Sequence, residues 1–306
     1  MTQNGDTSVQ WLTARERGTA LGMRWFVLLA TVFGRAVPRV FLTVVIAYYA
    51  VFFRSARRSS AAFLERVHGR KVGFGTVYRH LLRFGQVTLD RLFLVRGQLA
   101  RFTVTRTGHE HLSALRDSRR GAVLLGAHLG SFEAMRIGGE QEAMKINILA
   151  YVDNAKMINE VLSQLDPAGG ACVLAIRPGS LDAVFAAKER VEAGEFVALL
   201  GDRVGLNPRT ATVQFMGAPA RLPTGPYILA ALLGCPVYLT FGLYRGGDRY
   251  DLYCEPFSDK IVLPRGKAKA RALEDLAQRY ASRVEHYARQ APDNWFNFYD
   301  FWGDEC

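Results

Sequence analysis

Two kinds of hydrophobic pattern divide the chain near residue 100. Before that point, uncharged runs at residues 25–33 and 40–53 and apolar positions at helical spacing within residues 76–95 predict helices. After it, short apolar runs alternate with amphipathic stretches, as in strands followed by helices. We therefore expect an α/β fold, with a mixed, mostly parallel sheet flanked by helices. We divide the chain into an apolar helical N-terminal region, residues 1–100, and an α/β domain, residues 101–306.

The expected strands of the second region are short, and most of them are followed by a helix. The pattern predicts strands at residues 101–107, 123–125, 146–152, 172–176, 196–200, 212–216, 237–244 and 250–254. It predicts helices from residue 132 onward and at residues 156–165, 181–193, 226–233 and 267–289. Gly246 and Gly247 between the last two strands indicate a hairpin.

The apolar N-terminal segment is too short to predict a membrane-spanning helix. Residues 40–53 are uncharged, but a spanning helix needs about 20 apolar residues. Arginines stand on both sides of the apolar runs, so positive charge gives no orientation for a single span. A helical pair that lies in the membrane interface, or enters it and returns, fits better. A helical hairpin buried in a soluble protein is the alternative. No small-residue cleavage site follows the apolar runs, so we expect no signal peptide.

Positive charge is concentrated in the same region. Residues 1–100 contain fifteen Arg and Lys against four Asp and Glu, so this region accounts for the whole net charge of +11. A basic region beside apolar sequence predicts contact with an anionic membrane surface or an acidic carrier protein. Nucleic acid is a weaker alternative, because the arginines interleave with apolar runs and no recognised nucleic-acid-binding module is present. We expect no nucleic-acid partner.

Candidate chemistry begins at His128, directly after the buried strand at residues 123–125. Gly130 and Ser131 then interrupt the extended segment, and Ser131 is a good N-cap for a following helix. If the chain folds back here, the Glu133 carboxylate accepts a hydrogen bond from one imidazole nitrogen. The other nitrogen is then free to take a proton from an incoming hydroxyl. We interpret His128 as a general base and Glu133 as its orienting group. A core histidine satisfied by a neighbour is the alternative.

Two further motifs follow in order along the chain. Asp202 and Arg203 come directly after the strand at residues 196–200, and residues 215–226 read Phe-Met-Gly-Ala-Pro-Ala-Arg-Leu-Pro-Thr-Gly-Pro. With His-x4-Glu after a buried strand, these blocks resemble the glycerolipid acyltransferase superfamily. The similarity is greatest to the branch with the lauroyl and myristoyl acyltransferases of lipid A biosynthesis, and it extends from about residue 11 to residue 302.

The resemblance implies an acyltransferase on the cytoplasmic face of a bacterial inner membrane. Such an enzyme moves a fatty acyl group from an acyl-carrier-protein or CoA thioester to a hydroxyl or amine of a lipid or glycolipid acceptor. It also implies five substrate-binding residues, namely Asp202, Arg203, Arg221, Thr224 and Gly225. Arg203 is a candidate for a phosphate of donor or acceptor, and a structural Asp-Arg pair is the alternative. Residues 223–226 replace the Glu-Gly-Thr-Arg form of glycerol-phosphate enzymes, which favours the lipid A-like branch.

Other catalytic motifs are missing from the sequence. Residues 130–132 do not form a Gly-x-Ser-x-Gly elbow, so we expect direct transfer without an acyl-enzyme. We find no dinucleotide fingerprint, phosphate loop or metal motif, and expect no metal and no cofactor beyond the thioester donor. His109 and His111 diverge on a helix and do not suggest a metal site. Two alternatives stay open: a thioesterase or lipid hydrolase that uses the same His-Glu pair with water, and a non-catalytic protein that binds anionic lipid or nucleic acid.

Overall fold

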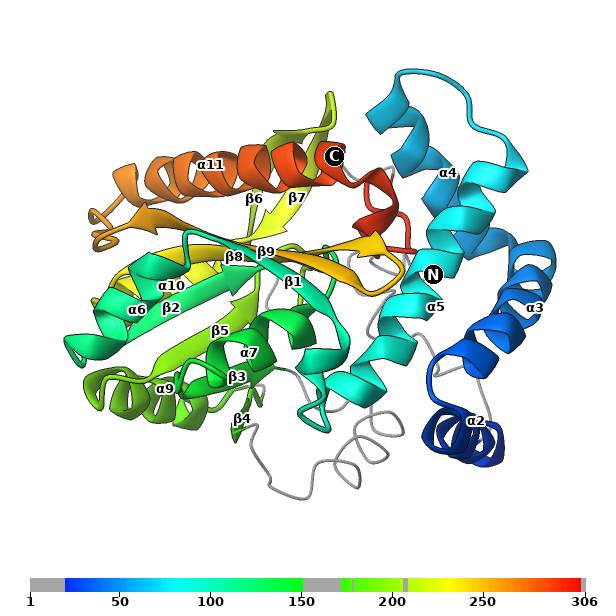
Figure 1. Ribbon diagram of the computed structural model, residues 1–306. Helices are drawn as coiled ribbons and strands as arrows, with labels where there is room; N and C mark the ends of the chain where they lie inside the picture. The colour runs from blue at the N-terminus through cyan, green and yellow to red at the C-terminus, as the bar shows by residue number, and fades with distance from the viewer. Residues whose placement is uncertain (1–19, 151–171, 178, 206–208, 304–306) are drawn as a thin grey trace.

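The computed structural model describes residues 20–150, 172–177, 179–205 and 209–303 (Figure 1). Its centre is a seven-stranded sheet with the strand order β1-β9-β8-β2-β5-β3-β4. The strands are β1 (Thr103–Thr107), β2 (Ala122–Gly126), β3 (Ile146–Ala150), β4 (Cys172–Ala175), β5 (Phe196–Leu200), β8 (Val237–Gly246) and β9 (Arg249–Ser258). Neighbours in this sheet run parallel except β8 and β9, which form the expected hairpin. The expected mixed, mostly parallel sheet flanked by helices is confirmed.

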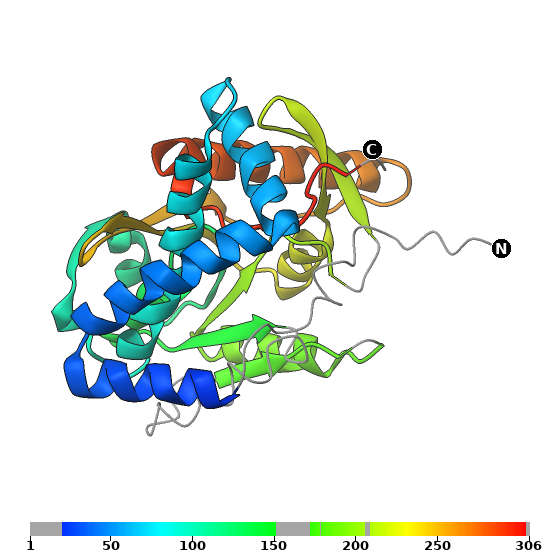
Figure 2. The same cartoon turned by 90° about the vertical axis from the view of Figure 1, so that its right-hand side faces the viewer.

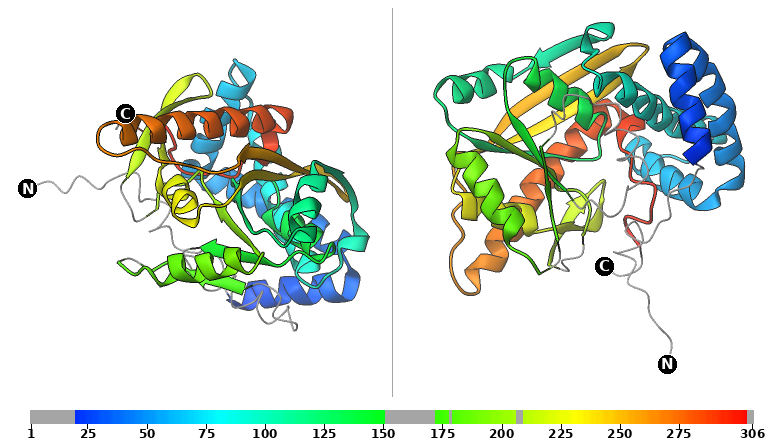
Figure 3. Two further views of the ribbon diagram at one scale, coloured as in Figure 1. Left: turned by 90° about the vertical axis from the view of Figure 1, so that its left-hand side faces the viewer. Right: turned by 90° about the horizontal axis from the view of Figure 1, so that it is seen from below.

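Side chains along β2 point alternately to the two faces of the sheet, and each face is covered by a different set of helices. Val123 and Leu125 belong to a core shared with α9 (Asp182–Glu192), α10 (Gly225–Leu233) and α11 (Ala268–Gln290). Leu124 faces the other way and packs with Leu112 and Leu115 of α6 (His109–Asp117). Helix α7 (Phe132–Glu140) lies beside α6 on that second face, because residues of both helices line one pocket with Leu124. Successive strand residues point to opposite faces, so β2 is buried on both sides. Figure 3 shows this arrangement of helices and sheet from two further sides.

One strand was not expected from the sequence. β7 (Ala218–Pro223) pairs antiparallel with β6 (Thr210–Phe215) in a separate two-stranded sheet that packs against α11. The turn between them places Met216 and Gly217 at positive φ angles of 52° and 78°. Two prolines and two alanines in β7 mask its strand character, because both residue types are normally depleted in strands. The helix expected at residues 156–165 lies outside the described residues.

From residue 20 onward, the described part of the N-terminal region contains four α-helices, which lie on one side of the sheet (Figure 1). They are α2 (Ala20–Phe33), α3 (Ala36–Phe52), α4 (Arg54–His68) and α5 (Phe74–Leu94). Helices α2 and α3 lie side by side (Figure 2), and α4 bends away from α3 by 92°. Among the described helices, none alone is long and apolar enough to cross a membrane. Of the helix pairs in the described ranges, α3 and α4 together, as a bent pair, have the necessary length and composition.

An apolar stripe of exposed side chains runs along α2 and α3. Its side chains are 44% to 70% exposed. They are Trp25, Leu28, Val32 and Phe33 of α2, and Val37, Val40, Phe41, Val44, Tyr48, Val51 and Phe52 of α3. A hairpin buried within its own chain would hide these side chains, so that alternative is not what the structure shows.

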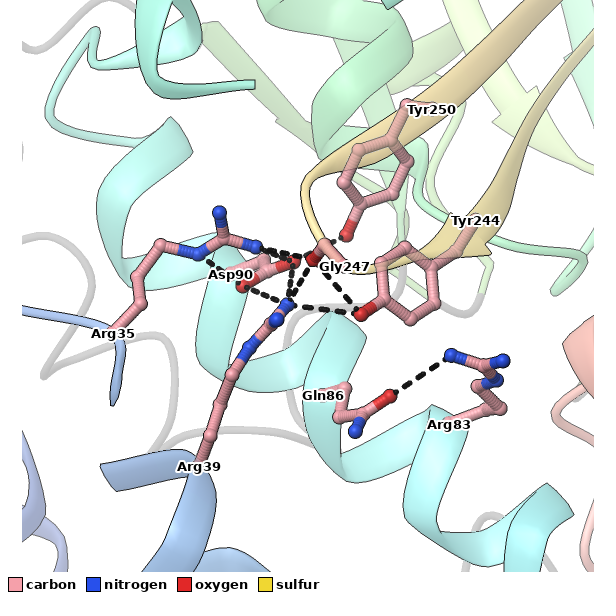
Figure 4. A network of polar contacts seen from close by, with 8 residues as sticks. All are labelled: Arg35, Arg39, Arg83, Gln86, Asp90, Tyr244, Gly247 and Tyr250. Carbon is pink, nitrogen blue, oxygen red and sulfur yellow. Dashed lines mark hydrogen bonds and ion pairs between the residues drawn. The ribbon is translucent and has the colours of Figure 1, made fainter. Parts of the chain in front are cut away.

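A buried carboxylate attaches these helices to the sheet (Figure 4). Asp90 of α5 is fully buried and forms ion pairs with Arg35 and Arg39 at distances of 2.9 and 3.3 Å. Tyr250 of β9 donates a hydrogen bond to Asp90 at 3.0 Å, and Arg39 donates to the Tyr244 hydroxyl of β8 at 2.9 Å. The network therefore fixes α3 and α5 against the β8–β9 hairpin.

The aromatic C-terminal tail is part of the core. Trp295 is 1% exposed and packs against Phe63 of α4 and Phe215 of β6. His80 of α5, also buried, lies 2.8 Å from the Ser60 hydroxyl and 3.0 Å from the Trp295 carbonyl oxygen. Trp295 therefore fills a gap in the hydrophobic core.

Candidate active site

The register between β2 and β5 brings His128 and Asp202 together. Gly126 pairs with Leu200 in a parallel ladder, and each functional residue stands two positions beyond its strand. Their side chains meet at the carboxyl ends of the strands, where ligand sites of α/β sheets collect. His128 Nδ1 lies 2.7 Å from Asp202 Oδ1, and the His128 backbone N–H donates to Asp202 Oδ2 at 3.0 Å.

The expected pairing of His128 with Glu133 is wrong. Glu133 lies in the first turn of α7, but its carboxylate accepts hydrogen bonds from Arg91 Nε at 2.9 Å and Arg136 Nε at 3.0 Å. Glu133 is 5% exposed and Arg136 2%, so this is a buried ion pair that also connects α7 to α5. Sequence distance suggested Glu133, but a helical side chain at this position reaches the neighbouring helix and not the preceding loop.

Electrostatics keep Asp202 ionised. Burial alone would raise its pKa, but the charge of the protonated His128 ring, the hydrogen bond from that ring, Arg203 and Asn297 together hold the pKa of Asp202 at about 2. A carboxylate can only accept, so Nδ1 of the ring carries the hydrogen of this contact. Burial, aided by Arg203, lowers the pKa of His128 below its ordinary value, and Asp202 opposes that shift. The imidazole is then neutral near pH 7 and unprotonated at Nε2.

Neutral His128 keeps one face open to solvent. Its side chain is 27% exposed, whereas that of Asp202 is 2% exposed. Within the described part of the chain, the ring forms no hydrogen bond through Nε2. An imidazole with a fixed tautomer and an accessible, unprotonated nitrogen can accept a proton from a hydroxyl or amine.

The loop that follows His128 is fixed by backbone contacts. Ser131 N–H donates to Gly242 O of β8 at 2.7 Å, and Gly130 N–H donates to Asn294 O at 2.8 Å. Gly130 has a φ of 73°, and a Cβ there would lie 2.0 Å from the Gly242 oxygen. Only glycine fits this position. Ser131 then caps α7 as expected, because its hydroxyl accepts the Ala134 N–H at 3.1 Å.

Arg203 contacts the C-terminal tail. Its Nε donates to Asn297 Oδ1 at 2.7 Å and its Nη2 donates to Phe296 O at 2.9 Å. Two of its donors therefore hold the tail beside Asp202, and neither of these two contacts is the Asp-Arg pair that the structural alternative expected.

The remaining expected substrate-binding residues lie on the β7–α10 connection. Arg221 is exposed and opposite Thr212 in the small hairpin, and Gly225 begins α10. Thr224 is buried, and its hydroxyl donates to the Arg209 carbonyl oxygen at 3.1 Å. In the chain as described, none of the three forms a hydrogen bond or ion pair with His128 or Asp202. Helix α10 runs back to the start of β8, so its N-terminus is at the same end of the sheet as His128.

Two features of the site were missed at the sequence level. Asp202 was expected to bind substrate, and its contact with the His128 ring was not expected. The available signal was that both residues directly follow buried strands. Asn297 was not identified at all, although a polar residue within an aromatic run often has a buried partner. Across the described residues, no group of three or more His, Cys, Asp or Glu side chains could hold a metal ion.

Comparison with known proteins assigns the chain to a family. A search of curated proteins finds no match. A sequence model described as bacterial lipid A biosynthesis acyltransferase matches residues 92–303, which is more than half of the chain and includes His128, Asp202 and the third block. The chain belongs to the bacterial lipid A biosynthesis acyltransferase family and is an acyltransferase.

Proposed function

We propose that the protein transfers a fatty acyl group from an acyl-carrier-protein or CoA thioester to a hydroxyl or amine of a lipid or glycolipid, with His128 as general base. The observation that carries the proposal is the 2.7 Å contact between His128 Nδ1 and Asp202 Oδ1. It fixes the tautomer in which Nε2 of the partly exposed ring is unprotonated.

The reaction needs one proton relay and no covalent enzyme intermediate. The oxygen or nitrogen of the acceptor attacks the thioester carbonyl while His128 Nε2 takes the proton from that atom. The tetrahedral intermediate then expels the thiolate, which takes the proton from His128. Asp202 stabilises the imidazolium that exists between the two transfers.

The intermediate also needs donors for its oxyanion. The backbone N–H groups at the start of α7 are the ones we propose, because the helix begins four residues after His128 and its positive end favours negative charge. The Ala134 N–H is already used by Ser131, which leaves the amides of Phe132 and Glu133 for this role.

Replacement of His128 by Ala tests the chemistry. We expect acyl transfer to fall roughly 10²- to 10⁴-fold with the fold retained, as is typical for loss of a general base. The assay follows transfer from a labelled acyl thioester to acceptor lipid in vesicles and measures released fatty acid in parallel. Release of free acid that does not depend on acceptor would identify a hydrolase. Unchanged transfer in the His128→Ala protein would remove the proposed base.

We propose further that the stripe on α2 and α3 lies on the anionic cytoplasmic face of a membrane. Its exposed Trp, Val and Phe side chains are suited to the interface, and arginines of α4 adjoin them. Arg57 caps the carboxyl end of α3 by donating to the carbonyl oxygens of Ala50 and Val51, each at 2.7 Å.

A matched pair of variants tests this surface. Val40→Asp with Val44→Asp should lower binding to anionic vesicles at least about tenfold, because each valine contributes roughly 1.5 kcal/mol when buried. Leu181→Asp with Phe185→Asp places the same charges on an exposed apolar patch of the α9 region and should leave binding unchanged. Equal binding by both variants and the unchanged protein would contradict the orientation. A salt-sensitive shift with RNA or duplex DNA, without vesicle binding, would favour a nucleic-acid-binding protein.

A further inference from the structure

The C-terminal tail forms one wall of the loop that holds His128. Leu129 and Trp295 form an antiparallel bridge, Gly130 N–H donates to Asn294 O at 2.8 Å, and Phe296 N–H donates to His128 O at 2.7 Å. Residues 294–296 thus run as a short strand beside residues 128–130. The next residue of the tail, Asn297, is delivered directly to the carboxylate of Asp202.

Asn297 is held at both ends of its amide. Its Nδ2 donates to Asp202 Oδ2 at 2.8 Å, and its Oδ1 accepts from Arg203 Nε at 2.7 Å. The side chain is 2% exposed. Because Arg203 can only donate and ionised Asp202 can only accept, the amide has one orientation, with oxygen toward Arg203 and nitrogen toward Asp202.

This contact determines how the Asp202 carboxylate is turned. Oδ2 accepts from both Asn297 and the His128 backbone N–H, so Oδ1 is left to face the ring nitrogen. Without the amide donor, one of the two contacts on Oδ2 is lost, and the carboxylate can rotate away from the ring. The fixed tautomer of His128 would then be populated less.

We propose that Asn297 is a positioning residue for the reaction, which acts on His128 through Asp202 and makes no contact with substrate. This inference rests on the proposed function, because it assigns a role within the same site. Asn297 holds Asp202, and Asp202 holds His128. Loss of the Asn297 amide should therefore slow the chemical step and leave substrate binding unchanged.

The tail also offers a matched control. Asn294 is fully buried and lies three residues earlier. Its amide contacts the backbone N–H and carbonyl oxygen of Tyr244 at 2.7 and 3.1 Å, and it donates to Asp293 Oδ1 at 3.1 Å. Asn294 and Asn297 therefore share residue type, burial and segment. They differ in whether the amide touches Asp202.

The experiment compares Asn297→Leu with Asn294→Leu. For Asn297→Leu we expect kcat to fall roughly 10- to 100-fold, the effect of losing a hydrogen bond to a charged group, with KM within about twofold of the unchanged protein. For Asn294→Leu we expect a lower melting temperature, but a kcat within about twofold when it is measured well below unfolding. Loss of kcat to the same extent in both proteins would show a structural role only and overturn the inference.

Asn297→Asp provides the test if Asn297→Leu does not fold. The aspartate has the shape of asparagine and still offers an oxygen that accepts from Arg203. The NH2 group that donates to Asp202 becomes a carboxylate oxygen, which cannot donate. The added negative charge raises the pKa of His128, so the acidic limb of kcat/KM should move to higher pH as kcat falls. A limb and kcat identical to those of the unchanged protein would overturn the inference.

The outcomes separate the two proposals. If the unchanged protein transfers acyl groups and the His128→Ala protein does not, the proposed base stands, and the Asn297 variants alone decide the positioning role. If His128→Ala remains active, the proposed function fails whatever the Asn297 variants show.

Discussion

Replacing Asp202 by Asn removes the negative charge of this side chain but keeps its shape, so it tests what the charge contributes. The pKa of Asp202 in the folded protein is about 2, against an ordinary value of 3.8. At 1.36 kcal/mol for each pH unit of difference, the ionised form contributes about 2 kcal/mol to the free energy of unfolding. A carboxylate with a lowered pKa in the folded state stabilises the fold at pH values above its ordinary pKa of 3.8. This contribution disappears as the pH falls from 3.8 through 2. The side chain is 2% exposed, so solvent screening removes little of it.

Asp202→Asn should therefore have two measurable effects. The free energy of unfolding should drop by about 2 kcal/mol at pH 7, and the difference from the unchanged protein should vanish near pH 2. Acyl transfer should fall roughly 10²- to 10⁴-fold, because the amide no longer selects the tautomer of His128 with a hydrogen on Nδ1. Denaturant titrations across pH and initial transfer rates measure the two effects separately.

Glu133→Gln is the control for this prediction. Glu133 is also a buried carboxylate, and the positive charges of Arg91 and Arg136 overcome its burial and lower its pKa. Its loss should reduce stability by removing the buried carboxylate that Arg91 and Arg136 share, although Arg136 keeps its ion pair with Glu140. The kcat of the folded protein should change much less than in Asp202→Asn. Near-normal transfer by Asp202→Asn, or an equal loss of kcat in Glu133→Gln, would refute the assignment of Asp202 as the orienting group.

Three further outcomes follow from the structure. Gly130→Ala should lower the free energy of unfolding by at least about 2 kcal/mol in thermal or chemical melts, because a Cβ would lie 2.0 Å from the Gly242 oxygen at a φ of 73°. Asp90→Asn should cost about 3 kcal/mol in the same melts, because it leaves two arginines without their buried anion. The acidic limb of kcat/KM should lie below pH 6.5, because burial lowers the pKa of His128 and the base is active only above that pKa.

Each of these outcomes has a clear contrary result. A melt of Gly130→Ala that matches the unchanged protein would mean that the loop adopts another path. Full stability of Asp90→Asn would mean that the arginines do not depend on the carboxylate. An acidic limb above pH 7 would show that Asp202 outweighs burial at His128.

The local pattern was sufficient for most secondary structure. Short apolar runs bounded by Gly and Ser, such as the one ending at Gly126, gave strands, and Ser131 was identified as a cap because its hydroxyl acts on an amide three residues away. β7 was the exception, because its pairing with β6 depends on a partner strand and on a turn with two positive φ angles. Strand propensity alone does not contain that information.

The sequence also indicated some of the residues of the candidate site. Motif order indicated His128, Asp202 and Arg203 as functional candidates and the family that the comparison shows. The sequence could not show which carboxylate faces the ring. Glu133 was near in sequence, but Arg91, forty-two residues before it, takes that carboxylate in the fold.

The sequence by itself determined the α/β class, the apolar and basic N-terminal helices, and the strand-turn-helix unit that presents His128, because these depend on side chains within a few residues of one another. The tertiary structure alone decided the partners: Asp202 reaches His128 through the β2–β5 register, and Asn297 reaches Asp202 through the path of the tail. Contacts across 74 and 95 residues are set by packing of the whole chain. No local pattern encodes them, because one shift in strand register would give each side chain a different neighbour.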